Sequence, residues 1–131
     1  MTDLSAFIIE DDPKLGVIYD TVLKQNGYQT EIIRRGDEAL KRLSEVAPHL
    51  ILLDLHLPYV SGVEILKFIR TTQALAGIQV IVLTADLYLA QSLEEQADYV
   101  IVKSFGVSRL RELVAELKAA ATSSAGSAQA T

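Results

Sequence analysis

The chain has 131 residues and a mass of 14.3 kDa, which fits a single domain. Half of the residues are hydrophobic and the mean hydropathy is +0.26, so the composition predicts a packed core and excludes disorder over most of the chain. The net charge is −5 and the sequence has no basic patch, so we expect no direct binding to nucleic acid. Cysteine is absent, which excludes disulfide scaffolds, thiolate zinc sites and cysteine nucleophiles.

The first residues lack the basic segment and the following apolar stretch of a secretory signal. No apolar run approaches the roughly 18 residues that a membrane-spanning helix needs. The sequence therefore predicts a soluble cytoplasmic protein that makes no contact with a membrane.

Five short apolar runs predict five strands, at residues 6–9, 30–33, 50–53, 80–83 and 99–102. Four of the runs are continuous, which is typical of strands that are covered on both faces of a parallel sheet. The second run alternates and contains Glu31, so we place it at or near an edge of the sheet.

Apolar residues at helical spacing follow each of these runs. The first helix is the best marked, because Asp12 suits the N-cap, Pro13 suits the first helical position and Gly27 suits the end. The other predicted helices begin near Asp37, Ser61, Leu87 and Ser108, with Ser61 and Ser108 as candidate N-caps. Residues 119–131 contain only Ala, Ser, Thr, Gly and Gln, so we predict a folded domain at 1–118 and a flexible tail or linker at 119–131.

Strands that alternate with helices predict an α/β fold, with a parallel sheet and helices on both of its faces. Glu10 and Asp11 follow the first strand, Asp54 the third and Lys103 the fifth, while Thr84 ends the fourth. These residues should converge, because such sheets bind ligands at the carboxyl ends of their strands.

Neighbouring carboxylates repel one another, and their oxygens suit Mg²⁺, with Mn²⁺ as an alternative. A lysine and a hydroxyl beside them suit phosphoryl oxygens, and an aspartate can itself form an acyl phosphate.

In four segments the sequence resembles the receiver domains of two-component response regulators, including the chemotaxis-regulator type. The segments are 7–13 (FIIEDDP), 52–62 (LLDLHLP, then SG), 82–85 (VLTA) and 102–105 (VKSF). Each is weak alone, but together, in this order and after these strands, they are highly specific. The resemblance covers residues 4 to about 118 and implies a flavodoxin-like, doubly wound sheet of five strands in the order 2-1-3-4-5.

The resemblance also implies roles for the acidic residues. Asp54 corresponds to the phosphoacceptor, and Asp11 to the direct ligand of the metal. Glu10 would act on the metal mostly through water, and the backbone carbonyl of His56 would complete the protein's share of the metal shell.

The phosphoryl group itself would meet three further residues. Thr84 would bind a phosphoryl oxygen, and Ala85 would leave room for the group. Lys103 would pair with Asp54 before phosphorylation and with the phosphoryl group afterwards. The implied chemistry is transfer from the phosphohistidine of a sensor histidine kinase or phosphotransfer protein to Asp54, followed by hydrolysis.

The domain would therefore be no enzyme beyond catalysing its own phosphorylation and dephosphorylation. It would signal through a downstream protein partner or an attached effector domain. A homodimer is compatible with this role, and the sequence leaves that point open.

Three other classes of protein share part of this sequence pattern. A phosphotransferase of the haloacid-dehalogenase type also uses a nucleophilic Asp with Mg²⁺, but it needs a second Asp where this chain has His56. A flavodoxin needs a phosphate-binding loop after the first strand, and the acidic residues 10–12 would repel a phosphate. The third class is a receiver-like protein-interaction module with weak or no phosphorylation-dependent switching. Two departures from the family pattern keep this third class open.

The first departure is Ser104, where the family usually has a proline preceded by a cis peptide bond. A cis bond before serine costs about 2.5–4 kcal/mol, against about 0.5–1 kcal/mol before proline. We therefore predict a trans bond between Lys103 and Ser104.

The second departure concerns the signalling face. Thr84 and Lys103 are 19 positions apart, which is shorter than expected by about three residues, close to one helical turn. We therefore predict a shortened, mobile fourth helix and a nonstandard output. The usual aromatic switch position is occupied by Val100, and Tyr99 sits one residue earlier, where a strand would point it to the opposite face. We take Tyr99 and Val100 as the candidate switch positions.

Overall fold

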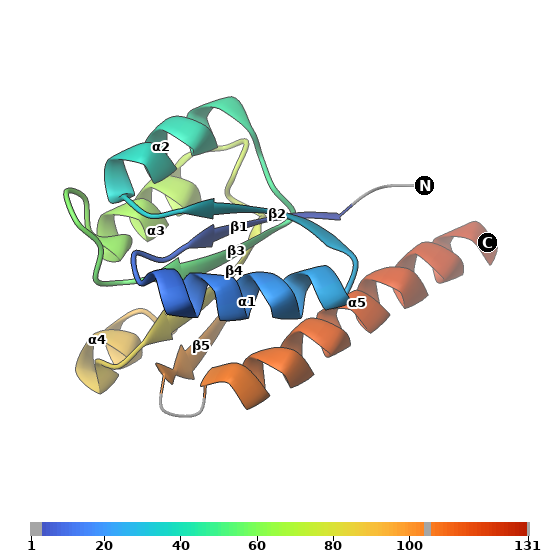
Figure 1. The fold of residues 1–131 in the computed structure, drawn as a ribbon. Coiled ribbons are helices and arrows are strands. Elements are labelled where there is room, and N and C mark those ends of the chain that lie inside the picture. Colours follow the sequence, from blue (N-terminus) through green and yellow to red (C-terminus); the bar gives the residue numbers. More distant parts are fainter. Residues whose placement is uncertain (1–3, 104–105, 131) are drawn as a thin grey trace.

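The computed structural model describes residues 4–103 and 106–130. The elements follow one another in strict alternation (Figure 1): β1 (Leu4–Ile9), α1 (Pro13–Gln25), β2 (Tyr28–Ile33), α2 (Gly36–Glu45), β3 (Leu50–Asp54), α3 (Gly62–Thr71), β4 (Gln79–Thr84), α4 (Leu87–Ser92), β5 (Tyr99–Val102) and α5 (Gly106–Ala130). No helix of the described part meets the length and apolarity that crossing a membrane requires.

The five strands form one parallel sheet in the order β2-β1-β3-β4-β5, which confirms the predicted fold. Helices α1 and α5 cover one face of the sheet, and α2, α3 and α4 cover the other (Figure 1). The second strand, β2, lies at an edge, as its alternating and charged sequence predicts. The sheet has a hydrophobic core on each face, and successive residues of a strand point into opposite cores. This explains why the apolar runs of the inner strands are continuous.

Strand β1 shows this division most simply. Phe7 and Ile9 belong to the core under α2 and α3, whereas Ala6 and Ile8 belong to the core under α1 and α5. All four side chains are buried. Helices therefore pack on both faces of the sheet. This packing positions the carboxyl ends of the strands, where the polar residues lie.

Local signals set the helix starts. The Oδ1 atom of Asp12 accepts hydrogen bonds from the N–H groups of Lys14 and Leu15, at 2.8 and 3.3 Å, and Pro13 is the first residue of α1. The Oγ atom of Ser61 accepts from the Glu64 N–H at 3.3 Å and caps α3. The predicted caps at Asp12 and Ser61 are confirmed.

Two predicted helix boundaries differ from the structure. Helix α2 begins at Gly36 rather than at Asp37. Helix α5 begins at Gly106, so Ser108 lies in its first turn and is not its cap. Propensity alone does not select the first residue of a helix, because the preceding loop fixes where the chain can turn.

Helix α5 also continues to Ala130, through the segment that composition predicts to be a flexible tail. Alanine has the highest intrinsic helix propensity, and this explains why an Ala-rich stretch extends a helix that has already begun. The division into a domain at 1–118 and a tail at 119–131 stays a prediction. Figure 1 shows α5 projecting past the sheet at its C-terminal end.

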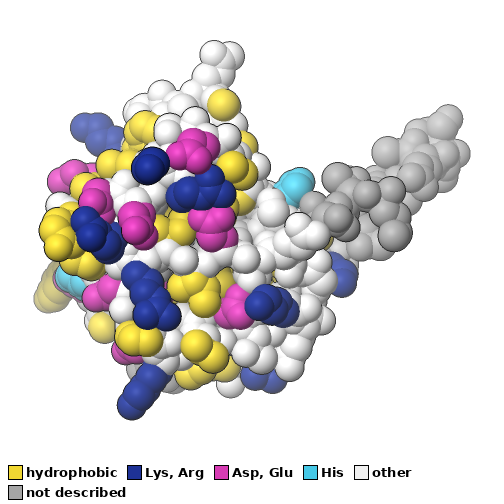
Figure 2. Space-filling view, turned by 45° about the horizontal axis from the view of Figure 1, so that its top comes forward, with side chains coloured by type: hydrophobic (Ala, Val, Ile, Leu, Met, Phe, Trp, Pro, Cys, Tyr) yellow, Lys and Arg dark blue, Asp and Glu magenta, His cyan; other side chains and the backbone are white. Residues whose placement is uncertain are grey.

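Helix α4 has only six residues, as the short interval between Thr84 and Lys103 predicts. Its mobility stays a prediction. Figure 2 shows one face of the molecule, on which acidic and basic side chains are interspersed with no extended area of one sign.

Candidate functional site

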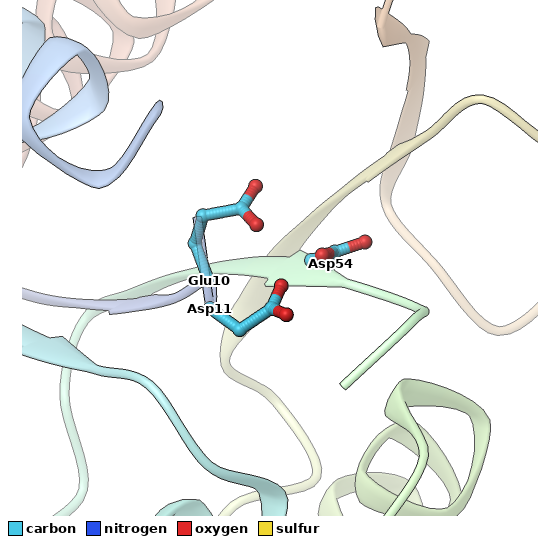
Figure 3. A group of neighbouring side chains, drawn as sticks. All are labelled: Glu10, Asp11 and Asp54. Carbon is cyan, nitrogen blue, oxygen red and sulfur yellow. The ribbon is translucent and has the colours of Figure 1, made fainter. Parts of the chain in front are cut away.

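Three carboxylates meet at the carboxyl edge of the sheet. Glu10 and Asp11 directly follow β1, and Asp54 is the last residue of β3. Strands β1 and β3 are adjacent and parallel, with Ile9 opposite Leu53, so their ends lie side by side. One oxygen from each of the three carboxylates lies within 4.8 Å of the others (Figure 3). Glu10 and Asp54 are 2% and 4% exposed, whereas Asp11 is open to solvent.

Lys103 brings a positive charge to the two buried carboxylates. It directly follows β5, the edge strand on the opposite side of the sheet from β2. Its Nζ atom lies 3.1 Å from Oε1 of Glu10 and 3.4 Å from Oδ2 of Asp54. One lysine therefore faces two carboxylates, and Asp11 adds a third negative charge beside them.

Backbone groups complete the surroundings of the carboxylates. The His56 N–H donates to Oδ1 of Asp54 at 3.1 Å, and the Asp12 N–H donates to Oε2 of Glu10 at 3.3 Å. The Oε1 atom of Glu10 is buried and, among the described residues, has only the ion pair with Lys103 and no hydrogen bond of good geometry. A buried acceptor of this kind is costly unless a further partner serves it.

The electrostatics of the cluster follow from this crowding. Burial raises the pKa of Glu10 to about 7, the nearby Asp54 carboxylate adds to this effect, and Lys103 only partly offsets it. Burial alone would lower the pKa of Lys103, but the charges of Asp54 and Glu10 outweigh it and leave that pKa raised. Without a cation, Glu10 therefore keeps its proton to a higher pH than an ordinary glutamate does.

This proton predicts a pH dependence of stability. Because the pKa of Glu10 in the folded protein lies at about 7, above its ordinary 4.5, folding favours the protonated carboxyl. In chelator, the contribution of Glu10 to the free energy of unfolding should be fully present below about pH 4.5. It should be lost as the pH rises to about 7, by about 1–3 kcal/mol in total.

Urea unfolding at several pH values would measure this loss, with Glu10→Gln as the matched variant. The difference between the two proteins isolates Glu10 from the other titrating groups. We expect the wild type to lose more stability than Glu10→Gln between pH 4.5 and 7.5. Parallel pH profiles for the two proteins would show that Glu10 is not the responsible group.

Two of the predicted phosphoryl-binding residues, Thr84 and Ala85, lie at the carboxyl end of β4, the strand between β3 and β5. Thr84 is the last residue of β4 and is fully buried, and its Oγ1 atom accepts a hydrogen bond from the Asp86 N–H at 3.0 Å. Ala85 comes next and is exposed. The His56 side chain is exposed, and the role of its carbonyl as a metal ligand stays a prediction.

The two candidate switch positions point to opposite faces of the sheet. Val100 packs against the core under α2, α3 and α4, and Tyr99 packs against the core under α1 and α5. Tyr99 therefore does not fill the position of Val100, as the strand alternation predicts. Their role in switching stays a prediction. The bond between Lys103 and Ser104 lies outside the described residues.

The structure adds residues that sequence reasoning did not place at the site. Tyr59, in the loop after Asp54, has a φ of +73°, and the Arg35 guanidinium lies 4.2 Å from the centre of its ring. No sequence pattern predicts the left-handed backbone at Tyr59, because tyrosine rarely adopts that conformation. Asp86 is the N-cap of α4, and an Asp just before a helical run is a signal that could have identified it.

Tyr19, on α1, is a core residue with 1% exposure. Burial raises the pKa of its hydroxyl to about 12, and the charges of Glu10 and Lys103 also act on it. Its phenol therefore stays protonated beside the acidic cluster.

Comparison with known proteins places this chain in one family. The response regulator receiver domain family matches residues 6–115. The DNA-binding response regulator MtrA of Mycolicibacterium smegmatis is 34% identical over 115 residues, covering 86% of this chain and 48% of MtrA. The phosphate regulon regulatory protein PhoB of Rhizobium meliloti is 36% identical over 115 residues, covering 86% of this chain and 49% of PhoB.

Among solved structures, the response regulator TrrA of Thermotoga maritima, in complex with Mg²⁺ and a beryllium fluoride, superposes with a TM-score of 0.77 and 30% identity. The match covers 87% of this chain and 98% of TrrA. This chain therefore belongs to the response regulator receiver domain family of two-component systems, which serve as phosphoacceptors. It spans about half the length of the curated relatives it matches.

Proposed function

We propose that Asp54 is the phosphoacceptor, taking its phosphoryl group from a phosphohistidine of a sensor histidine kinase or phosphotransfer protein. The observation that carries the proposal is the buried Asp54 carboxylate at the end of β3, with the Lys103 ammonium 3.4 Å from its Oδ2. An aspartate carboxylate can act as a nucleophile toward phosphorus. An adjacent ammonium group can orient this carboxylate and stabilise the phosphorylated product.

In the transfer, a carboxylate oxygen of Asp54 attacks phosphorus and the P–N bond to the histidine breaks. The bonding electron pair returns to the imidazole nitrogen, and an acyl phosphate forms on Asp54. Lys103 stabilises negative charge on the phosphoryl oxygens, and the hydroxyl of Thr84 can donate to one of them. Ala85 carries only a methyl group, so it leaves space beside Thr84.

Hydrolysis then returns the site to its starting state. Water attacks phosphorus, the bond to the Asp54 oxygen breaks, and inorganic phosphate leaves with the carboxylate regenerated. On this proposal the domain catalyses only its own phosphorylation and dephosphorylation and turns over no other substrate.

The acidic cluster fits Mg²⁺, with Mn²⁺ as an alternative. Its donors are oxygens, they lie within 4.8 Å of one another, and Glu10 has a buried oxygen that lacks a hydrogen bond among the described residues. We propose that Asp11, Asp54 and the carbonyl of His56 hold the ion, with Glu10 acting through water. When bound, the cation would neutralise the carboxylates and attract phosphoryl oxygens. TrrA, in complex with Mg²⁺ and a phosphoryl-like fluoride, supports this assignment.

The output partner is proposed by analogy. Relatives such as MtrA are DNA-binding response regulators about twice as long as the matched region. We propose that this domain acts on an attached effector or on a separate downstream protein, including a second copy of itself. With a net charge of −5, the domain itself is not proposed to contact nucleic acid.

The metal assignment predicts a strong effect of Asp11→Asn. Loss of a direct carboxylate ligand should weaken Mg²⁺ binding at least about tenfold and slow phosphorylation by acetyl phosphate at fixed Mg²⁺. The fold should survive, because Asp11 is exposed.

Asp12→Asn is the matched control, since Asp12 is the neighbouring carboxylate and caps α1. Asparagine caps helices about as well as aspartate, so this variant should bind Mg²⁺ with nearly the wild-type affinity. Equal losses in the two variants would mean that the local negative charge, and not a ligand at Asp11, governs the metal.

A further inference from the structure

The loop between β3 and α3 contains a turn of an uncommon kind. The carbonyl of Pro58 accepts a hydrogen bond from the Val60 N–H at 2.9 Å, and Tyr59, the residue between them, has a φ of +73°. This bond and this φ together describe a γ-turn of the positive-φ form, which is rare and strained. A side chain at such a position disfavours the turn, so the backbone of Tyr59 needs neighbouring contacts to hold it.

The start of α2 supplies backbone contacts of this kind. The loop lies beside the first residue of α2 (Figure 1), where the Gly36 N–H donates to the same Pro58 carbonyl at 3.2 Å. A Cβ atom at Gly36 would lie 1.9 Å from the carbonyl oxygen of Val60. Only glycine therefore allows α2 to approach the turn this closely, and the turn packs directly on the beginning of the helix.

Arg35 adds a side-chain contact to the same turn. Its guanidinium lies 4.2 Å from the centre of the Tyr59 ring. The Nε and Nη2 atoms of this guanidinium donate to the two carboxylate oxygens of Asp37, at 3.0 and 2.7 Å. This bidentate pair fixes the plane of the guanidinium. Because Tyr59 is 76% exposed, burial does little to hold its ring, and the stack with Arg35 is the interaction that favours its position.

The γ-turn lies in a loop that is closed at both ends. The Leu55 carbonyl accepts from the Gly62 N–H at 2.9 Å, and the His56 N–H donates to Oδ1 of Asp54 at 3.1 Å. His56, whose carbonyl we propose as a metal ligand, lies inside this loop ahead of Tyr59. A short closed loop has few dihedral angles in which to absorb a change of conformation. A change in the γ-turn therefore alters the direction of the His56 carbonyl.

We propose that Arg35 and Tyr59 are positioning residues for the metal site, in which their stack holds the γ-turn and the γ-turn directs the His56 carbonyl toward the cation. The proposal rests on the metal site proposed above. Neither side chain would touch the metal. Groups that orient a ligand affect metal affinity without contacting the ion, because they determine how well the ligand is aligned before the ion arrives.

The effect of Arg35→Ala on Mg²⁺ binding separates this role from simple electrostatics. Removing a positive charge near the acidic cluster would by itself favour a cation, whereas losing the stack should weaken its binding. We expect Arg35→Ala to bind Mg²⁺ about 2-fold to 5-fold more weakly than wild type, the range that corresponds to an exposed cation–π contact. Arg34→Ala is the matched control, because Arg34 is the neighbouring exposed arginine. It should bind Mg²⁺ as tightly as wild type or slightly more tightly.

Substitutions at Tyr59 test whether the stack acts through the backbone of the turn. Glycine adopts a left-handed backbone freely, so the turn in Tyr59→Gly needs no stack to hold it. We expect Tyr59→Ala to lose Mg²⁺ affinity as Arg35→Ala does, and Tyr59→Gly to retain nearly the wild-type affinity. Adding Arg35→Ala to Tyr59→Gly should then have no further effect, which makes the two substitutions strongly non-additive.

Mg²⁺ affinity is measured on the full chain by following amide NMR shifts during titration, and urea unfolding in chelator shows that each variant is folded. Equal affinity in Arg35→Ala and Arg34→Ala would overturn the proposal. So would a loss in Arg35→Ala that persists undiminished in the Tyr59→Gly background. If wild type binds no Mg²⁺, or if Asp11→Asn binds it as tightly as wild type, the metal site itself is wrong and the proposal fails with it.

Discussion

Replacing Asp54 with asparagine is expected to abolish phosphoryl uptake while leaving the domain folded. The amide cannot form the acyl phosphate that the carboxylate forms, so the rate should fall at least about a hundredfold, to background. The variant should not be less stable in chelator, because Glu10 and Asp54 repel each other and Lys103 only partly offsets that repulsion. Intact mass after incubation with acetyl phosphate and Mg²⁺ measures the uptake, and urea unfolding measures the stability.

Asp37→Asn serves as the control for a general effect of losing an aspartate. The Asp37 side chain is 44% exposed and, in the described part of the chain, forms an ion pair with Arg35 at the start of α2. Exposed ion pairs contribute little, so this variant should take up one phosphoryl group at nearly the wild-type rate. Uptake of one acid-labile phosphoryl group by Asp54→Asn at the wild-type rate would contradict the site assignment.

The second large effect is expected on stability, from Gly62→Ala. A Cβ atom at Gly62 would lie 2.3 Å from the carbonyl oxygen of Asp54 and 2.5 Å from Cα of Leu55. Both contacts are with backbone, which cannot move aside without shifting the end of β3 or the start of α3. We expect a loss of about 2–4 kcal/mol in the free energy of unfolding. Phosphorylation should slow as well, because the displaced backbone carries Asp54.

Gly77→Ala is the matched control for this prediction. Among the described residues, no heavy atom outside Gly77 and its two chain neighbours lies within 4 Å of the Cβ position at Gly77, and its φ is not in the left-handed region. This variant should have the wild-type stability or gain up to about 1 kcal/mol, since alanine lowers the entropy of the unfolded chain. Equal stability of the two variants would show that the close approach of Gly62 to Asp54 is not required.

Much of the fold could be predicted because local signals agreed with the topology. The continuous apolar runs indicated buried parallel strands, and the charged run with Glu31 indicated the edge strand β2. Asp12 and Ser61 marked helix starts because their side chains bond the first turn locally. The convergence of Glu10, Asp11 and Asp54 followed from parallel strands that end at the same edge.

What the sequence did not reveal depends on contacts between distant segments. The pKa of Glu10 is raised because its side chain is buried beside Asp54. The spacing of residues in the sequence does not predict this burial. Arg70 resembles any lysine or arginine on a helix, and only the folded chain brings it to Gln96 and Asp98. Composition alone also does not separate an alanine-rich linker from a helix that propagates, so it does not determine how far α5 continues.

The most direct test of the phosphoacceptor assignment is to locate the phosphoryl group on the wild-type chain. The protein is incubated with acetyl phosphate, with Mg²⁺ or with chelator, then reduced with borohydride and mapped by peptide mass spectrometry. We predict one modified residue, Asp54, converted to homoserine only in the presence of Mg²⁺. Modification at another residue, such as His56 or Asp11, or modification that is equal in chelator, would contradict the account.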